Sequence, residues 1–125
     1  MILSPRSLKA LEGVHEDLIS VVRYVEKATK LDFIITQGLR TKDEQKTLVK
    51  KGLSMTMKSR HLTGHAFDFV PLVDGIVSWQ ILPFIPLIAE FKAAGKALRV
   101  PIESGGDWKS FKDYPHIQLP WKDYP

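Results

Sequence analysis

Two groups of potential metal ligands, far apart in the sequence, place the strongest constraint on how this chain can fold. His61 and Asp68 lie in the stretch from Ser59 to Asp68, whereas Asp113 and His116 lie near the carboxyl end. Two imidazoles and one carboxylate, from His61, Asp68 and His116, would leave a fourth tetrahedral position open to water. That is the ligand count of a catalytic zinc site, because structural sites fill all four positions with protein. The fold must therefore bring both groups together.

A further carboxylate, Asp113, lies three residues before His116. At this spacing it could take a proton from water that the metal activates. The chain has no cysteine, so disulfides and thiolate sites are excluded and the metal must use His, Asp or Glu. It also lacks the contiguous His-Glu-x-x-His motif of the zincins.

Composition favours one compact domain over residues 1–125, since 44% of the residues are hydrophobic. The net charge of +4 would attract a polyanion, either nucleic acid or an anionic cell wall. Basic residues do not alternate with aromatic ones as in a single-strand binding platform, so we expect no nucleic acid partner. The amino terminus lacks the apolar core of a signal peptide, and residues 81–89 are too short to span a bilayer, so we expect no membrane insertion.

The amino-terminal third has a helical pattern. Ser4 can cap a helix with Pro5 at its first position, and apolar spacing continues to about Lys30, so we expect one helix over this range. The stripe expected in the core comprises Leu8, Leu11, Val14, Leu18, Val21, Val22 and Val25. His15 lies beside the stripe and is expected at the surface or at the boundary of the core.

The remaining elements follow from periodicity and turn residues. Strands are expected at residues 33–37, 66–70, 100–102 and 116–119, with Pro71 ending the second. Helices are expected at residues 41–51, opened by a capping box, and at residues 79–98, with both of its prolines in or near the first turns. Residues 53–60 and 105–108 are expected to be loops, and Asp74-Gly75 a turn. This order favours a small α+β domain with helices packed on an antiparallel sheet.

The strand that carries Asp68 is expected to have two different faces. Alternation places Ala66 and Asp68 on one face and Phe67 and Phe69 on the other. The small side chain of Ala66 would leave room for a metal and its substrate. His65 has a ligand-like spacing to Asp68, but alternation turns it away, so we expect it to face the substrate or to support the ligands.

The stretch Ser-Arg-His-Leu-Thr-Gly-His-Ala-Phe-Asp at residues 59–68, followed downstream by Asp-Tyr-Pro-His at 113–116, resembles zinc peptidases of the D-alanyl-D-alanine dipeptidase and carboxypeptidase family. With the terminal Trp-x-x-Phe-x-Asp-x-Pro-His pattern, it is most similar to phage endolysins that are L-alanyl-D-glutamate endopeptidases. The resemblance runs from Gln37 to Gln118. It implies a hedgehog/D-Ala-D-Ala-peptidase-like fold with His61, Asp68 and His116 as zinc ligands.

The resemblance also implies roles for other residues. Asp113 matches the catalytic carboxylate, Ser59 a residue near the bound substrate, and Arg40 an arginine that stabilises the oxyanion. Arg40 could instead form an exposed salt bridge, and Ser59 could be an ordinary loop hydroxyl. Trp108 and Phe111 are expected to pack beneath the site. Gln37 and Gln45 also recur in the resemblance, but their residue types and positions alone do not indicate a role for them.

Taken together, these features predict a zinc-dependent endolysin that cuts the L-Ala–D-Glu bond of peptidoglycan stem peptides. The alternatives are a D-Ala-D-Ala carboxypeptidase or dipeptidase with the same zinc chemistry, and a non-catalytic zinc-dependent wall-binding module. The retained Asp113 argues against the module. We expect a monomer that stays in the cytoplasm of the infected host and reaches the wall through a holin-type pore.

Overall fold

The computed structural model describes residues 1–54 and 56–125. Within this part of the chain the helices are α1 (Pro5–Ala10), α2 (Glu16–Ala28), α3 (Lys42–Lys50) and α4 (Ile81–Leu98), with short 3-10 helices η1 (Arg60–Thr63) and η2 (Gly105–Asp107). The strands are β1 (Asp32–Gln37), β2 (Ala66–Val73), β3 (Ile76–Val77), β4 (Glu103–Ser104) and β5 (His116–Gln118).

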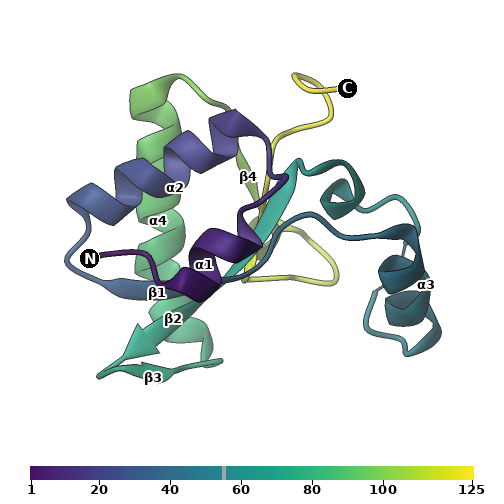
Figure 1. The fold of residues 1–125 in the computed structure, drawn as a ribbon, viewed down its shortest axis with the longest axis horizontal. Coiled ribbons are helices and arrows are strands. Elements are labelled where there is room, and N and C mark those ends of the chain that lie inside the picture. Colours follow the sequence, from purple (N-terminus) through teal and green to yellow (C-terminus); the bar gives the residue numbers. More distant parts are fainter. Residues whose placement is uncertain (55) are drawn as a thin grey trace.

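The strands form one antiparallel sheet in the order β1-β2-β5-β4, with β3 paired to the distal end of β2. α1 packs on β1, α4 packs on β2, and α2 packs on α4, whereas α3 lies to one side of the sheet (Figure 1). The predicted α+β fold, with helices packed on an antiparallel sheet, is confirmed.

Aromatic rings fill the space between α4 and the sheet. The ring of Phe91, on α4, lies 5.3 Å from those of Phe33 and Phe67 and 4.9 Å from that of Phe69, measured between centroids. Phe67 and Phe69 are therefore on the core face of β2, as alternation predicts. Because these side chains are fully buried, they fix the opposite face of β2, on which Asp68 lies.

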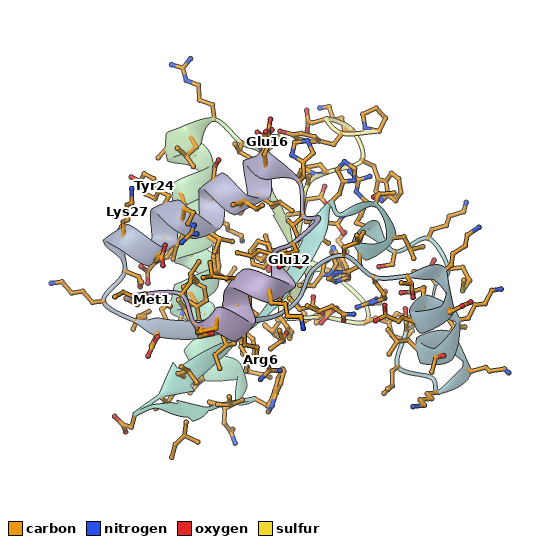
Figure 2. The ribbon with its side chains drawn as sticks, viewed as in Figure 1. Met1, Arg6, Glu12, Glu16, Tyr24 and Lys27 are labelled. Carbon is orange, nitrogen blue, oxygen red and sulfur yellow. The ribbon has the colours of Figure 1, made fainter. Side chains whose placement is uncertain are left out.

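α2 has the two faces expected of a helix that covers a core. Its buried residues are Leu18, Val21, Val22 and Val25. Glu16, Tyr24 and Lys27 lie on the exposed face (Figure 2). His15 is half-buried and caps the helix, since its Nδ1 accepts a hydrogen bond from the backbone N–H of Asp17 at 3.0 Å.

The single helix predicted for residues 4–30 is wrong, because the chain breaks between α1 and α2. Gly13 adopts a φ of +82°, which only glycine adopts without strain. The break also leaves Leu8 exposed, although its spacing predicted a core position. It brings the α1–α2 turn against the segment after β1, where a Cβ on Gly38 would overlap the backbone oxygen of Ala10. Backbones therefore touch directly beside the elements that carry the polar site.

Two strand predictions also needed correction. β2 continues through Pro71 to Val73. Pro71 lies between the part of β2 that pairs with β5 and the part that pairs with β3. At this position the strand does not need an N–H from residue 71 for its hydrogen bonds, so proline is tolerated. Residues 100–102 are not a strand. The N–H of Val100 bonds to the carbonyl of Gly95 at the end of α4, and pairing with β5 begins only at Glu103.

Other local predictions are confirmed. Thr41 and Glu44 form the reciprocal capping box of α3. α4 begins near the predicted residue, with Pro83 in its first turn and Pro86 in its second.

The predicted loop at residues 53–60 includes Met55, which lies outside the described residues. Among the described residues, no helix is both long and apolar enough to cross a membrane.

Gly64 and Gly75 provide a matched test of the backbone contact beside the site. Both have positive φ, +74° and +78°, but a Cβ on Gly64 would overlap the carbonyl oxygen of Gly13, whereas nothing lies within 4 Å of one on Gly75. We expect Gly75→Ala to lower the free energy of unfolding by about 1 kcal/mol through left-handed strain. Gly64→Ala should lower the free energy of unfolding by roughly 1–3 kcal/mol more than Gly75→Ala does. Urea denaturation measures both, and equal losses would contradict a tight contact at Gly64.

Candidate metal centre

The register of three strands places the polar residues of the site in one row. Asp68 on β2 lies directly opposite His116 on β5, and Gln37 at the end of β1 pairs with Asp68 from the other side. Directly opposed residues of an antiparallel pair have their side chains on the same face. The 3-10 helix η1 then brings His61 over this row. Asp68 and His116 are 48 residues apart in the sequence, and the register therefore brings their side chains together in the site.

The donor atoms of His61, Asp68 and His116 lie within 4.8 Å of one another. Nε2 of His61 is 3.1 Å and Nδ1 of His116 is 3.4 Å from Oδ1 of Asp68. A tetrahedral ion at about 2.0–2.1 Å from each donor would separate the donors by roughly 3.3 Å. Two of the three donor pairs thus already have the spacing that such an ion requires, and this group could hold a metal ion.

Hydrogen bonds on the outer sides of both imidazoles fix which nitrogen faces the site. Nδ1 of His61 lies 2.8 Å from the carbonyl oxygen of Gly38, and Nε2 of His116 lies 2.8 Å from Oε1 of Gln118. Because both partners are acceptors, each outer nitrogen carries a proton, so the inner nitrogen is the one that can lose its proton and present a lone pair when a metal binds. Nε2 of Gln118 in turn donates to Glu103 at 3.1 Å. Sequence reasoning missed Gln118 and Glu103, although Gln118 shares the face of His116 by strand alternation.

Asp68 is the negative centre of the group. Burial alone would raise its pKa, but hydrogen bonds from His116 and His61 and the charges of these rings outweigh burial and hold the pKa well below its usual range. Burial likewise opposes the charged form of His116, but the hydrogen bond and charge of Asp68 raise its pKa. A carboxylate between two imidazoles therefore stays ionised, as a metal ligand must be.

Arg40 lies inside the site and is not an exposed surface residue. Only 8% of its surface is exposed, and its Nη2 lies 3.9 Å from Oδ2 of Asp68. Its Nη1 donates to Oε1 of Gln45 at 2.6 Å, and its Nη2 donates to Oε1 of Gln37 at 2.7 Å. The two glutamines that recur in the resemblance thus have a physical role, which is to orient the guanidinium. Its Nε is buried and has no partner among the described residues.

Asp113 is brought close to the site by a turn that packs on Gly105. Its N–H donates to the carbonyl oxygen of Gly105 at 2.9 Å, and its own carbonyl accepts from the N–H of His116 at 3.1 Å. A Cβ on Gly105 would overlap the backbone oxygen of Asp113 and press on the side chain of His116, so only glycine fits here. Burial, followed by the negative charge of Asp68, raises the pKa of Asp113. A carboxylate with a raised pKa is better suited to accept a proton.

Ser59 and His65 occupy different places around the site. Ser59 caps η1, since its hydroxyl accepts from the N–H of His61 at 3.2 Å and so supports the turn that presents this ligand. His65 is turned away from the metal group, and its Nδ1 lies 2.6 Å from the hydroxyl of Thr63. Its ring lies 5.4 Å from that of His15.

The two aromatic residues expected beneath the site differ. Trp108 is half-buried and its ring lies 5.2 Å from that of His116, which agrees with packing. Phe111 does not pack there, because 71% of its surface is exposed and its φ is +52°. The turn that positions Asp113 has thus forced a large apolar side chain outward.

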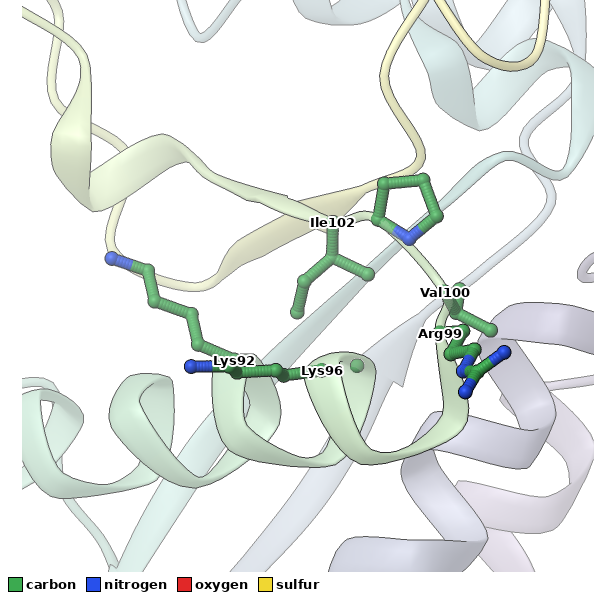
Figure 3. Close-up of a pocket in the computed structure, with 7 residues that line it drawn as sticks. Lys92, Lys96, Arg99, Val100 and Ile102 are labelled. Atoms are coloured by element: carbon green, nitrogen blue, oxygen red, sulfur yellow. The ribbon is translucent and has the colours of Figure 1, made fainter.

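The candidate site is identified by its chemistry and not by the hollow drawn in Figure 3. That hollow, of about 450 Å³, lies at the carboxyl end of α4. Cations at Lys92, Lys96 and Arg99 surround an apolar floor that includes Val100 and Ile102 (Figure 3). None of its lining residues belongs to the metal group.

Comparisons with known proteins agree with this geometry. The family model described as phage L-alanyl-D-glutamate peptidase matches residues 1–123. The L-alanyl-D-glutamate peptidase of Escherichia phage T5 is 35% identical over 112 residues, which cover 86% of this chain and 82% of the relative. The peptidoglycan L-alanyl-D-glutamate endopeptidase CwlK of Bacillus subtilis strain 168 is 31% identical over 85% of this chain and 75% of its own length. The crystal structure of the Serratia marcescens L-Ala D-Glu endopeptidase ChiX superimposes with a TM-score of 0.92 at 39% identity, covering 98% of this chain and 92% of that one.

The ligand assignment can be tested with three histidine variants. We expect the wild type to bind about one zinc ion per chain, and His61→Ala and His116→Ala to lose most of this affinity because each removes one of three ligands. His65→Ala is the matched control and should keep its zinc, since its ring bonds to Thr63. Calorimetric titration with zinc measures the three affinities. Zinc lost from the His65 variant and retained by the His61 variant would reverse the assignment.

Proposed function

The chain belongs to the family of phage L-alanyl-D-glutamate peptidases, and from this premise we propose that it is a zinc-dependent endolysin that hydrolyses the L-Ala–D-Glu bond of peptidoglycan stem peptides. The observation that carries the proposal is the register pair of Asp68 and His116, which brings three candidate ligands together beside a half-buried carboxylate and a buried arginine. The named relatives are endopeptidases, which supports this activity over that of a D-Ala-D-Ala carboxypeptidase.

Zinc is the metal that best suits these ligands. Two neutral imidazoles and one carboxylate, with no thiolate, form the protein part of many catalytic zinc sites. The outer nitrogens of His61 and His116 bond to Gly38 and Gln118, which leaves the inner nitrogens to bind the metal once they lose their protons, and Asp68 stays ionised between them. When bound, zinc would act as a Lewis acid toward the scissile carbonyl and lower the pKa of water from about 15.7 toward 7.

Asp113 is proposed as the general base and then the general acid. Its raised pKa favours uptake of a proton from the attacking water, and the same proton is then returned to the leaving amine of D-Glu. Because Asp113 is absent from the three-residue metal group, it is free to exchange protons without leaving a ligand position.

Arg40 is proposed to stabilise the oxyanion that forms at the carbonyl. The two glutamine acceptors hold its guanidinium in place before substrate arrives, so little reorganisation is needed when charge develops. Ser59 is proposed to lie near the bound peptide while capping η1, and His65 to contact substrate outside the metal group.

The biological setting is proposed from the phage relatives. The protein would act as a monomeric domain spanning residues 1–125, accumulate in the cytoplasm of the infected host, and reach the wall through a holin-type pore. Its net charge of +4 would favour contact with an anionic wall. Membrane insertion and nucleic acid binding are not part of this proposal.

Replacing Asp113 separates an enzyme from a wall-binding module. We expect Asp113→Asn to fold, to bind zinc and to bind peptidoglycan, because the amide keeps the size of the carboxylate. It should hydrolyse peptidoglycan at least about a hundredfold more slowly, since the proton acceptor is lost. Release of amino groups from purified sacculi measures the rate, and Asp43→Asn, on the exposed face of α3, is the matched control. A variant as fast as the wild type would exclude Asp113 as the base.

The bond itself is identified by mass spectrometry of the released products. We expect new amino termini on D-Glu and glycan strands that remain uncut. Release of terminal D-Ala alone would favour the carboxypeptidase. No release from any type of peptidoglycan, with zinc bound, would favour the non-catalytic module.

A further inference from the structure

Arg60 is a buried cation that the proposed chemistry does not use. It directly precedes the ligand His61 in η1, and only 3% of its surface is exposed. Its Nε donates to the carbonyl oxygen of Leu119 at 3.2 Å, and its Nη2 donates to the carbonyl oxygen of Tyr124. Its guanidinium carbon lies 4.0 Å from the centroid of the Trp121 ring. All three contacts are with the last seven residues of the chain.

This guanidinium has no carboxylate in contact with it among the described residues. Burial lowers the pKa of Arg60, and the charge of Glu103, which opposes this effect, acts without a direct ion pair. A buried charge without a partner is costly, and among the described residues the carbonyls and the indole of the C-terminal segment compensate this cost. The position of the segment and the burial of Arg60 therefore depend on each other.

The C-terminal segment, defined here as Leu119–Pro125, is also attached at its far end. The hydroxyl of Tyr124 donates to Oδ2 of Asp17 at 2.6 Å, and its ring lies 5.2 Å from that of His15 at the start of α2. At its near end, the N–H of Leu119 donates to the carbonyl of His65 at 2.9 Å. The segment thus spans from β5, across η1, to α2.

These contacts connect the two halves of the metal group. His116 begins β5, which continues directly into the C-terminal segment, whereas His61 follows Arg60 in η1. Apart from the ligands themselves, the Arg60–Leu119 hydrogen bond is a side-chain link between these two chain segments, which are 59 residues apart at that bond. A shift of η1 relative to β5 would change the distance between the two imidazoles, whose ring centroids are 5.0 Å apart.

We propose that Arg60 is a positioning residue that clamps the C-terminal segment onto η1 and thereby fixes the spacing of His61 and His116 for metal binding. This inference rests on the proposed metal site. It assigns to the end of the chain a role in metal affinity, although none of its residues approaches the ligands as a donor. The effect of losing the clamp is a weaker metal site, with little change in how substrate binds once the metal is present.

The test compares full-length variants. Arg60→Met keeps an apolar stem of similar length and removes the guanidinium. We expect its zinc dissociation constant, measured by competition with a chromophoric chelator, to rise about 10–100-fold, the range typical of residues that support metal ligands. Carboxypeptidase should also remove the C-terminal segment faster. Arg23→Met, an exposed arginine on α2, is the matched control and should leave both properties unchanged.

A second pair of variants approaches the clamp from the other side without altering the buried charge. Trp121→Ala and Tyr124→Phe remove the indole over Arg60 and the hydrogen bond to Asp17. We expect each to weaken zinc binding severalfold, and KM at saturating zinc to stay within about threefold of the wild-type value, because the substrate contacts are unchanged. A general loss of structure would instead alter KM and the circular dichroism spectrum.

Zinc affinity and sensitivity to carboxypeptidase can be measured without any catalysis by this protein. A failure of the clamp can therefore be distinguished from a failure of the proposed function. Wild-type zinc affinity in Arg60→Met and in both segment variants would overturn the clamp, even if the protein cleaves peptidoglycan. Weakened affinity in all three variants of a protein that cleaves no peptidoglycan would support the clamp and contradict the enzyme. If Arg60→Met fails to fold, the two segment variants decide.

Discussion

The direct pairing of Asp68 with His116 across β2 and β5 is the constraint on which the rest of the site depends. It fixes a carboxylate and an imidazole side by side on the face of the sheet that is opposite the phenylalanine core. A shift of one strand by one residue in this register would turn one of the two side chains to the opposite face. The core rings of Phe67 and Phe69 oppose such a shift, because each is fully buried against Phe91. Packing on one face of β2 therefore sets the chemistry on the other.

Neutral acceptors orient the charged groups around this pair. The carbonyl of Gly38 and the amide of Gln118 hold the two imidazoles, while Gln37 and Gln45 hold Arg40. Neutral partners fix geometry without cancelling the charge that they position, so Arg40 keeps its attraction for a developing anion. Close backbone contacts at Gly38, Gly64 and Gly105 bring the loops near enough for these bonds to form. The precision of the site thus comes from both the sheet and its glycine contacts.

The sequence predicted which polar residues lie together better than it predicted the path of the chain. His61, Asp68 and His116 were recognisable from residue type and spacing, and alternation on β2 correctly separated Asp68 from the core. The break at Gly13 was missed because apolar spacing continues across it, and only the contact with the segment after β1 requires the turn. The exposure of Phe111 was missed because an aromatic residue near a site is ordinarily packed. Glu103 and Arg60 were missed because their roles depend on partners that are distant in the sequence. Gln118 was missed although its partner His116 lies two residues away on the same face of β5.

The fold alone brings the three ligand atoms within 4.8 Å of one another, close enough to bind one tetrahedral ion. The most direct test is a crystal structure of the zinc-loaded protein with anomalous data collected at the zinc absorption edge. We predict one strong anomalous peak at about 2.0–2.2 Å from Nε2 of His61, Nδ1 of His116 and a carboxylate oxygen of Asp68. The surrounding backbone should be unchanged, because the donors are already 3.1 and 3.4 Å apart. A peak bound through Nε2 of His116, or one located away from Asp68, would contradict the account.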